Sequence, residues 1–295
     1  MKHEILEPAF IRRLEKLSLL SKKIFAGKVQ SLRRSTHKGY SAEFSDYRSY
    51  EQGDDLRYID WNIYARIEKM LVKLFVAEEE LSLNIIVDNS KSMCCPDDTK
   101  LLYAKKIAAA LSYISLANLD RVGISAFSSE LNIKVFPSRG KKHFFDCVHY
   151  LNDMEEESGT NINKALIDFA NTMKSPGVVV VISDFFDPES YERGLNYLLH
   201  KKYDVNIIQL LSPNELKFNM EGDLRLTDVE SEEFMDITVT DKLIENYSGK
   251  LDELCRGLER FCLKRGVTYI KASTETNFEE LILKYFKVKK MLKSK

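Results

Sequence analysis

From residue 81 onward, short apolar segments typical of β-strands alternate with helical patterns. The most restrictive of them is Val178–Ser183, which begins with five consecutive aliphatic residues and predicts a strand covered on both faces. Leu83–Val87 is also mostly apolar and precedes a helical pattern at about 98–117. Because parallel strands need long crossover connections, this alternation predicts an α/β fold. We expect a Rossmann-like, mostly parallel sheet flanked by helices.

The remaining periodicity completes this alternation. Further helices are predicted at about 141–153, 162–173, 188–200, 240–264 and 276–288, and further strands at 204–211 and 267–271. Two segments break the pattern as hairpins. One joins Val122–Phe127 to Leu131–Phe136 at a sheet edge, and the other is a β-hairpin inserted within 213–239.

Three regions follow from these patterns. Residues 1–80 form an N-terminal extension, with an amphipathic helix at 8–27 and a stretch at 40–80 that is rich in aromatic and charged residues. Such a stretch is too aromatic for a disordered linker, so we expect it to pack on the main domain. Residues 81–288 are that domain, and 289–295 are a basic tail.

Polar side chains follow the apolar strands where each strand ends. Asp88, Ser90 and Ser92 form a D-x-S-x-S sequence after the first strand, and Asp184 follows Val178–Ser183. A further hydroxyl, Thr160, precedes a helical pattern. Carboxyl ends of parallel strands meet at one edge of a sheet, so the fold should bring Asp88 and Asp184 together.

Oxygen-only ligands of this kind suit Mg²⁺, and Mn²⁺ equally. A lone D-x-S-x-S is weak evidence because Asp and Ser also cap helices, but the three segments in order are stronger. Hydroxyl ligands do not neutralise the ion, which would stay electrophilic and could take a carboxylate from another molecule. The sequence therefore predicts a docking site for a protein partner that offers a carboxylate.

This arrangement resembles the metal-ion-dependent adhesion site of von Willebrand factor A-type domains. The resemblance covers about residues 81–285 and implies that Ser90, Ser92 and Thr160 bind the ion directly. In this chain Phe185 stands where a Gly is common after the last Asp. This difference should alter the shape of the loop more than its ligation.

The segment from Gly39 to Arg66 resembles the signature of a bacterial family of domains of unknown function, number 58 (DUF58). That family couples this signature to an A-type domain, and the two parts span about residues 10–285 here. The resemblance implies partnership with a MoxR-type AAA+ ATPase in the assembly or maturation of other proteins. It implies no settled biochemical activity.

The signature residues also have a structural interpretation. They are Arg48, Gly53, Asp54, Asp55, Arg57, Asp60, Trp61 and Arg66. Gly53 suits a turn with positive φ, the acids suit caps, and the arginines suit ion pairs with those acids. A second metal site at Asp54, Asp55 and Asp60 is conceivable, and we favour the structural interpretation.

Composition limits the classes of function. The chain is 44% hydrophobic and 30% charged, as in ordinary soluble globular proteins, and no apolar run reaches the roughly 20 residues of a transmembrane segment. Its five cysteines form no C-x-x-C pair, so we expect a cytoplasmic protein. Basic residues gather at 22–38, where the single Phe25 gives no aromatic interleaving for base stacking, and the net charge is −1. We therefore expect no nucleic-acid partner.

Two functions remain. The first is a non-catalytic, metal-dependent protein-binding module that acts as an adaptor or co-chaperone. It is favoured because the sequence has no Ser-His-Asp order, Walker loop or dinucleotide fingerprint. The alternative is a Mg²⁺-dependent phosphatase or phosphotransferase with Asp88 as its nucleophile. Against it, the usual second acid of a D-x-D motif is replaced by Ser90.

Overall fold

The computed structural model describes residues 8–25, 34–35, 42–78, 82–94, 99–173, 175–187, 189–217, 222–227 and 234–292. The chain divides into two compact units, each of which is described by itself. Unit 1 comprises Met1–Ile24 and Ser82–Lys295, and unit 2 comprises Phe25–Leu81. This division differs from the predicted extension at 1–80, because nearly all of the N-terminal helix belongs to unit 1.

Unit 1 is built on a six-stranded sheet with the order β11-β8-β7-β4-β5-β6. Its strands are β4 (Ser82–Asp88), β5 (Arg121–Phe127), β6 (Leu131–Ser138), β7 (Val178–Ser183), β8 (Asp204–Leu211) and β11 (Thr268–Ser273). Neighbouring strands are parallel except for β5 and β6, which form the predicted antiparallel hairpin at the edge. The predicted mostly parallel α/β fold is thus confirmed. β7 is buried along its whole length, as its aliphatic sequence requires.

The strand order reverses between β4 and β7. From β4 the chain moves outward through β5 and β6, and it then returns to the other side of β4 through β7, β8 and β11. Open α/β sheets bind ligands outside the carboxyl ends of the strands at such a switch point. Asp88 is the last residue of β4, and Asp184 directly follows β7. Both aspartates therefore lie at the switch point.

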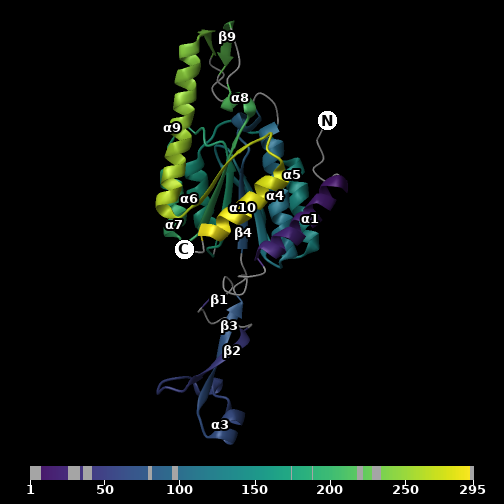
Figure 1. The fold of residues 1–295 in the computed structure, drawn as a ribbon, viewed down its shortest axis with the longest axis vertical. Helices are drawn as coiled ribbons and strands as arrows, with labels where there is room; N and C mark the ends of the chain where they lie inside the picture. Colours follow the sequence, from purple (N-terminus) through teal and green to yellow (C-terminus); the bar gives the residue numbers. More distant parts are fainter. Residues whose placement is uncertain are drawn as a thin grey trace. The chain divides into compact units, whose positions relative to one another are not determined.

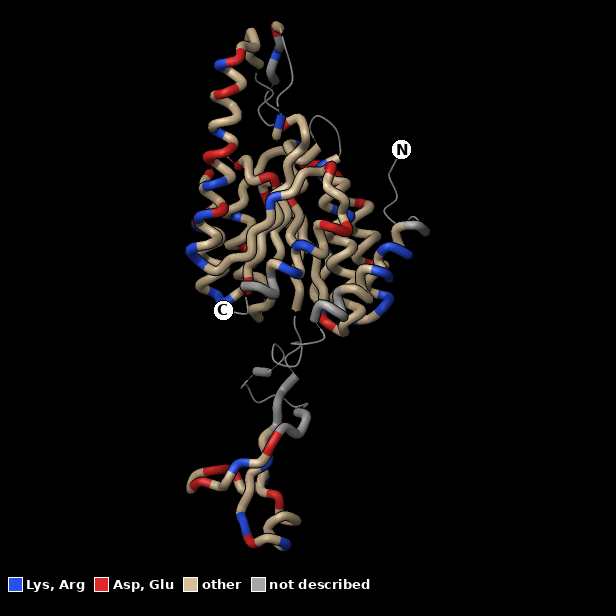
Figure 2. The backbone as a smooth tube through the Cα atoms, in the orientation of Figure 1, with Lys and Arg blue, Asp and Glu red and all other residues tan. Residues whose placement is uncertain are grey.

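Helices cover both faces of this sheet (Figure 1). One layer contains α6 (Ile162–Thr172), α7 (Glu192–His200) and α9 (Asp241–Arg265), whose apolar residues share a core with Val179 and Val181 of β7. The other contains α4 (Thr99–Ala117), α5 (Lys141–Asp153), α10 (Phe278–Leu292) and α1 (Pro8–Phe25). The rings of Phe10 and Phe278 lie 5.4 Å apart, which places α1 against α10. Charged residues lie on the helices and loops, and few lie in the middle of the sheet (Figure 2).

The segment between β8 and β11 contains the predicted inserted hairpin. Its strands are β9 (Gly222–Thr227) and β10 (Phe234–Val239), which pair antiparallel. A short helix that the sequence did not predict, α8 (Pro213–Leu216), precedes them. In Figure 1, β9 lies beyond α8, toward the end of the unit where α9 begins, and none of residues 241–250 is buried. Near the end of the sequence, α10 runs to Leu292 and so includes most of the predicted basic tail at 289–295.

Unit 2 is a small antiparallel sheet with two short helices. Its strands have the order β1-β3-β2 and comprise β1 (Arg34–Ser35), β2 (Ala42–Ser49) and β3 (Leu71–Glu78). The helices are η1 (Leu56–Tyr58) and α3 (Trp61–Ile67). Among the helices of the described ranges in both units, none is both long and apolar enough to span a bilayer.

Candidate functional site

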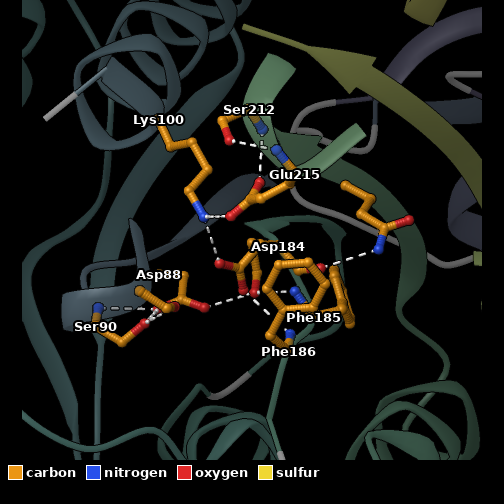
Figure 3. A network of polar contacts seen from close by, with 11 residues as sticks. Asp88, Ser90, Lys100, Asp184, Phe185, Phe186, Ser212 and Glu215 are labelled. Carbon is orange, nitrogen blue, oxygen red and sulfur yellow. Dashed lines mark hydrogen bonds and ion pairs between the residues drawn. The ribbon is translucent and has the colours of Figure 1, made fainter. Parts of the chain in front are cut away.

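Asp88 lies in a buried network of polar contacts (Figure 3). Its Oδ1 accepts a hydrogen bond from the Ser90 backbone N–H at 3.0 Å and another from the Ser90 hydroxyl at 2.6 Å. Its Oδ2 accepts from the Ser183 hydroxyl at 2.5 Å. Burial and the charge of nearby Asp184 raise the pKa of Asp88 to about 7, although the hydrogen bonds from Ser183 and Ser90 lower it. The site therefore holds a carboxylate whose charged form lacks compensation.

The two predicted serine ligands lie side by side. The hydroxyl oxygens of Ser90 and Ser92 are 3.1 Å apart, because the short helix η2 (Lys91–Cys94) begins directly after Ser90. Neighbouring ligands around an octahedral Mg²⁺ lie about 3 Å apart, given Mg–O distances of about 2.1 Å. The spacing of the two oxygens and the uncompensated carboxylate both fit a hard cation. Within the described ranges no three His, Cys, Asp or Glu side chains form a ligand group, so an ion here would depend on hydroxyls.

On the β7 side, the carboxylate of Asp184 contacts a lysine that the sequence analysis did not select. Lys100 of α4 is 1% exposed, and its Nζ lies 2.9 Å from Asp184 Oδ2 and 2.5 Å from Glu215 Oε1 of α8. Burial by itself lowers the pKa of Lys100, but the two carboxylates raise it above its ordinary value. The second oxygen of Asp184, Oδ1, accepts from the Phe186 backbone N–H at 3.1 Å. This aspartate is thus held by an ammonium and a backbone donor.

The loop that carries Thr160 runs beside the D-x-S-x-S loop. The side-chain amide of Asn89 donates to the Glu155 carbonyl at 2.8 Å, and the Glu157 N–H donates to the Asn89 carbonyl at 2.9 Å. Thr160 itself is half-buried and directly precedes Asn161, the N-cap of α6. Within the described ranges no hydrogen bond links Thr160 to the other four predicted ligands. The structure therefore joins Asp88, Ser90 and Ser92 by hydrogen bonds and places the charge of Asp184 close to Asp88, and direct ligation by Thr160 stays a prediction.

Phe185 has the backbone conformation that explains the usual glycine at its position. Its φ is 62°, in the left-handed region that side chains other than glycine disfavour. Its ring is 2% exposed and packs into the core beneath α6, α7 and α9. The burial of the ring offsets the backbone strain. That Phe185 alters the shape of the loop more than its binding of an ion stays a prediction.

Some of the signature residues of unit 2 stabilise a turn and η1. Gly53 has a φ of 109°. Arg48 donates to Asp54 at 2.8 Å, and Arg57 donates to Asp55 at 2.6 Å while Asp55 caps η1. These contacts are ion pairs and a cap of the kind that the structural interpretation of this segment predicts.

The remaining signature residues belong to α3. Asp60 caps this helix by accepting from two backbone N–H groups, and it also lies 3.0 Å from Lys73 Nζ. Trp61 is 54% exposed, and its ring meets that of Tyr64 edge to face. Arg66 is exposed and forms no ion pair within the described part of unit 2. The predicted pairing of Arg66 is therefore not found there.

Comparison with known proteins places most of the chain in one family. A family model described as "Protein of unknown function DUF58" matches residues 46–252. Similar curated proteins include the uncharacterized protein Mb1516 of Mycobacterium bovis and the uncharacterized protein Rv1480 of Mycobacterium tuberculosis. Each is 24% identical over 257 residues, which cover 84% of this chain and 80% of the relative.

Two solved structures are similar to part of this chain. One is an aerotolerance-related membrane protein from Bacteroides fragilis, with a TM-score of 0.46 and 15% identity over 72% of this chain and 100% of that chain. The other is the conserved hypothetical protein BatB from Bacteroides thetaiotaomicron, with a TM-score of 0.45 and 12% identity over 73% and 100%.

Proposed function

Since the chain belongs to the DUF58 family of proteins of unknown function, we propose a function from its own site: a non-catalytic, metal-dependent protein-binding module. The observation that carries the proposal is the pair of serine hydroxyls 3.1 Å apart beside the buried carboxylate of Asp88. This group lies at the switch point of the sheet, where α/β folds bind ligands.

In this proposal Ser90, Ser92, Asp88 and Asp184 hold Mg²⁺ or Mn²⁺, and Thr160 is the fifth ligand. When bound, the ion supplies an electrophilic centre for the carboxylate of a protein partner. The chain's own residues orient that centre. Ser183 and Ser90 fix the Asp88 carboxyl group by hydrogen bonds at both of its oxygens.

The surroundings of Asp88 support binding rather than phosphoryl transfer. A nucleophilic aspartate must reach the phosphorus of its substrate with one oxygen. The side chain of Asp88 is 2% exposed, and both of its oxygens accept hydrogen bonds from protein groups. Lys100, which holds Asp184, is 1% exposed and engaged by two carboxylates, so neither side chain is open to a phosphate ester.

We further propose that the partner is a MoxR-type AAA+ ATPase, and that the chain acts as its adaptor or co-chaperone in the assembly or maturation of other proteins. This step rests on the resemblance of the segment from Gly39 to Arg66 and on the family match. The adaptor role also suits a site that binds a carboxylate without transforming it.

Calorimetric titration of Mg²⁺ and Mn²⁺ tests the ion site. We expect about one ion per chain in the wild type and at least tenfold weaker binding in Ser92→Ala, which removes one hydroxyl. Ser138→Ala at the exposed end of β6 is the matched control and should bind as the wild type does. Equal binding by Ser92→Ala and the control would refute the assignment of the ligands, as would a wild type that binds neither ion.

A second experiment tests the partner. The immobilised chain is offered a purified MoxR-type ATPase from the same genome, with Mg²⁺ or with EDTA. Capture should require the ion and should fail for Ser92→Ala but not for Ser138→Ala. Steady hydrolysis of phosphate esters by the wild type, abolished in Asp88→Asn, would instead favour the phosphatase.

A further inference from the structure

Lys100 is an unusual cation for a metal site, because it lies inside the protein beside a carboxylate that the ion would use. Its Nζ contacts Asp184 and Glu215, and it lies 5.6 Å from the centre of the Phe186 ring. Removing an ammonium from water is costly unless carboxylates compensate it. The two carboxylates provide that compensation, so the buried ammonium of Lys100 is balanced by protein groups alone.

We propose that Lys100 is a tethered cation that competes with the metal ion for Asp184, and that Glu215 decides the outcome. The proposal rests on the proposed function, since it requires an ion to bind beside Asp88 and Asp184. It gives Lys100 and Glu215 the role of positioning residues, which act on the ion through Asp184.

The competition follows from how the oxygens of Asp184 are used. Oδ2 is bonded to Lys100, and Oδ1 accepts from the Phe186 backbone N–H. An ion that binds to the Asp184 carboxylate therefore weakens the bond between this carboxylate and Lys100. The ion and the ammonium of Lys100 then share the single negative charge of Asp184. Glu215 relieves the conflict, because it holds the ammonium by a second charged hydrogen bond of 2.5 Å.

Glu215 also connects the site to α8. While its Oε1 accepts from Lys100, its Oε2 accepts from the Ser212 backbone N–H at 2.6 Å, and its own N–H donates to the Ser212 hydroxyl. This reciprocal pair is a capping box, which fixes the start of α8. A change in the Lys100–Glu215 contact therefore reaches the backbone of α8.

The contacts continue from α8 into α9. Phe186, which follows the site, packs with Leu216 of α8 and Tyr247 of α9 on a small core. Tyr247 belongs to the first part of α9, residues 241–250, in which no residue is fully buried. Because coupling between two sites is reciprocal, an ion whose affinity depends on Glu215 must in turn change the stability of α8 and of this stretch.

The test is a calorimetric titration of Mn²⁺ into four chains. They are the wild type, Glu215→Gln, the double variant Lys100→Met/Glu215→Gln and the control Asp252→Asn, which removes an acid from an exposed ion pair on α9. Glu215→Gln leaves Asp184 as the only carboxylate for Lys100, so Mn²⁺ should bind at least tenfold more weakly. The double variant removes the competing cation and should bind at least as tightly as the wild type. The control should stay within twofold of the wild type.

Hydrogen exchange gives a second readout that does not depend on affinity. Saturating Mn²⁺ should change the protection of residues 212–217 and 241–250 in the wild type, and it should leave them unchanged in the double variant. Circular dichroism establishes that each variant is folded. If the double variant does not fold, the comparison of Glu215→Gln with Asp252→Asn still decides the competition.

The outcomes separate the two proposals. Equal Mn²⁺ affinity in the wild type and Glu215→Gln would overturn the competition while leaving the proposed function intact. A wild type that binds no ion, with a double variant that does bind, would support the competition and refute the metal-dependent function. If no chain binds Mn²⁺, both proposals fail.

Discussion

Replacing Asp88 with Asn should remove a pH dependence of stability that the wild type shows without metal. The folded protein retains the proton of Asp88 up to about pH 7, whereas the unfolded chain releases it near 3.8. Between these values the folded state binds more protons, so its stability falls as the pH rises, and above about 7 this loss is complete. A pKa raised from 3.8 to about 7 corresponds to about 4 kcal/mol.

Most of this effect lies within an accessible range of pH. From about pH 5 to about pH 8 the free energy of unfolding should fall by about 3 kcal/mol because of Asp88. That is a large fraction of a typical domain stability of about 5–15 kcal/mol. Asn carries no charge and keeps an oxygen for the Ser90 donors. The free energy of unfolding of Asp88→Asn should therefore lack the pH-dependent fall that Asp88 causes, and this variant should be the more stable chain at the higher pH.

The assay is urea unfolding of both chains in EDTA across this range, followed by circular dichroism. The far-ultraviolet signal comes mainly from the helices of unit 1. Trp61 is the only tryptophan of the chain and lies in unit 2, so its fluorescence serves as the internal control and should show no difference between the chains.

The same unfolding experiment is repeated with added Mg²⁺. If the ion binds at Asp88, adding it at about 100 times its Kd at the higher pH should return about 3 kcal/mol to the wild type and nothing to Asp88→Asn. Equal pH dependence in the two chains without metal would refute the argument that burial controls the charge of Asp88.

Three further substitutions test the fold around the site and in unit 2. Gly177→Ala would place a Cβ against the backbone carbonyl of Ser82 in β4, so unit 1 should lose about 1–3 kcal/mol in urea unfolding, and an unchanged midpoint would contradict the packing. Phe185→Gly should relieve about 1 kcal/mol of backbone strain but lose about 3–5 kcal/mol from the burial of the ring, so its free energy of unfolding should decrease. A variant more stable than the wild type would show that the strain is the larger effect. Asp60→Ala removes the cap of α3 and should lower the unfolding midpoint reported by Trp61 fluorescence while leaving the circular dichroism transition of unit 1 in place.

The parts of the site that lie on strands could be predicted from the sequence. Aliphatic runs identify β4 and β7 as central strands, and the switch-point rule then brings Asp88 and Asp184 to one edge of the sheet. The spacing of Ser90 and Ser92 within one loop is a local property, so it too could be predicted. The structure confirms this fold and joins Asp88, Ser90 and Ser92 by hydrogen bonds, with Asp184 near enough for its charge to raise the pKa of Asp88.

The residues that balance the charge could not be predicted in the same way. Lys100 is one of three lysines on α4, and nothing in the local pattern distinguishes it from Lys105 or Lys106. Its partners Asp184 and Glu215 are 84 and 115 residues away in the sequence. Glu215 also lies on a four-residue helix, within a segment that was interpreted only as a hairpin. Contacts set by the packing of three separate elements leave no periodic signal.

Protein groups and a retained proton together balance the charges at the switch point. Lys100 compensates Asp184 and Glu215, and a raised pKa lets Asp88 keep its proton near neutral pH. Structural metal sites differ, because there the energy of binding the ion is needed for folding. Under the proposed function, ion binding here would instead exchange one set of charges for another: the proton of Asp88 leaves and Lys100 turns toward Glu215. Such an ion can bind and leave a folded protein, which a docking site needs if its partner is to be released.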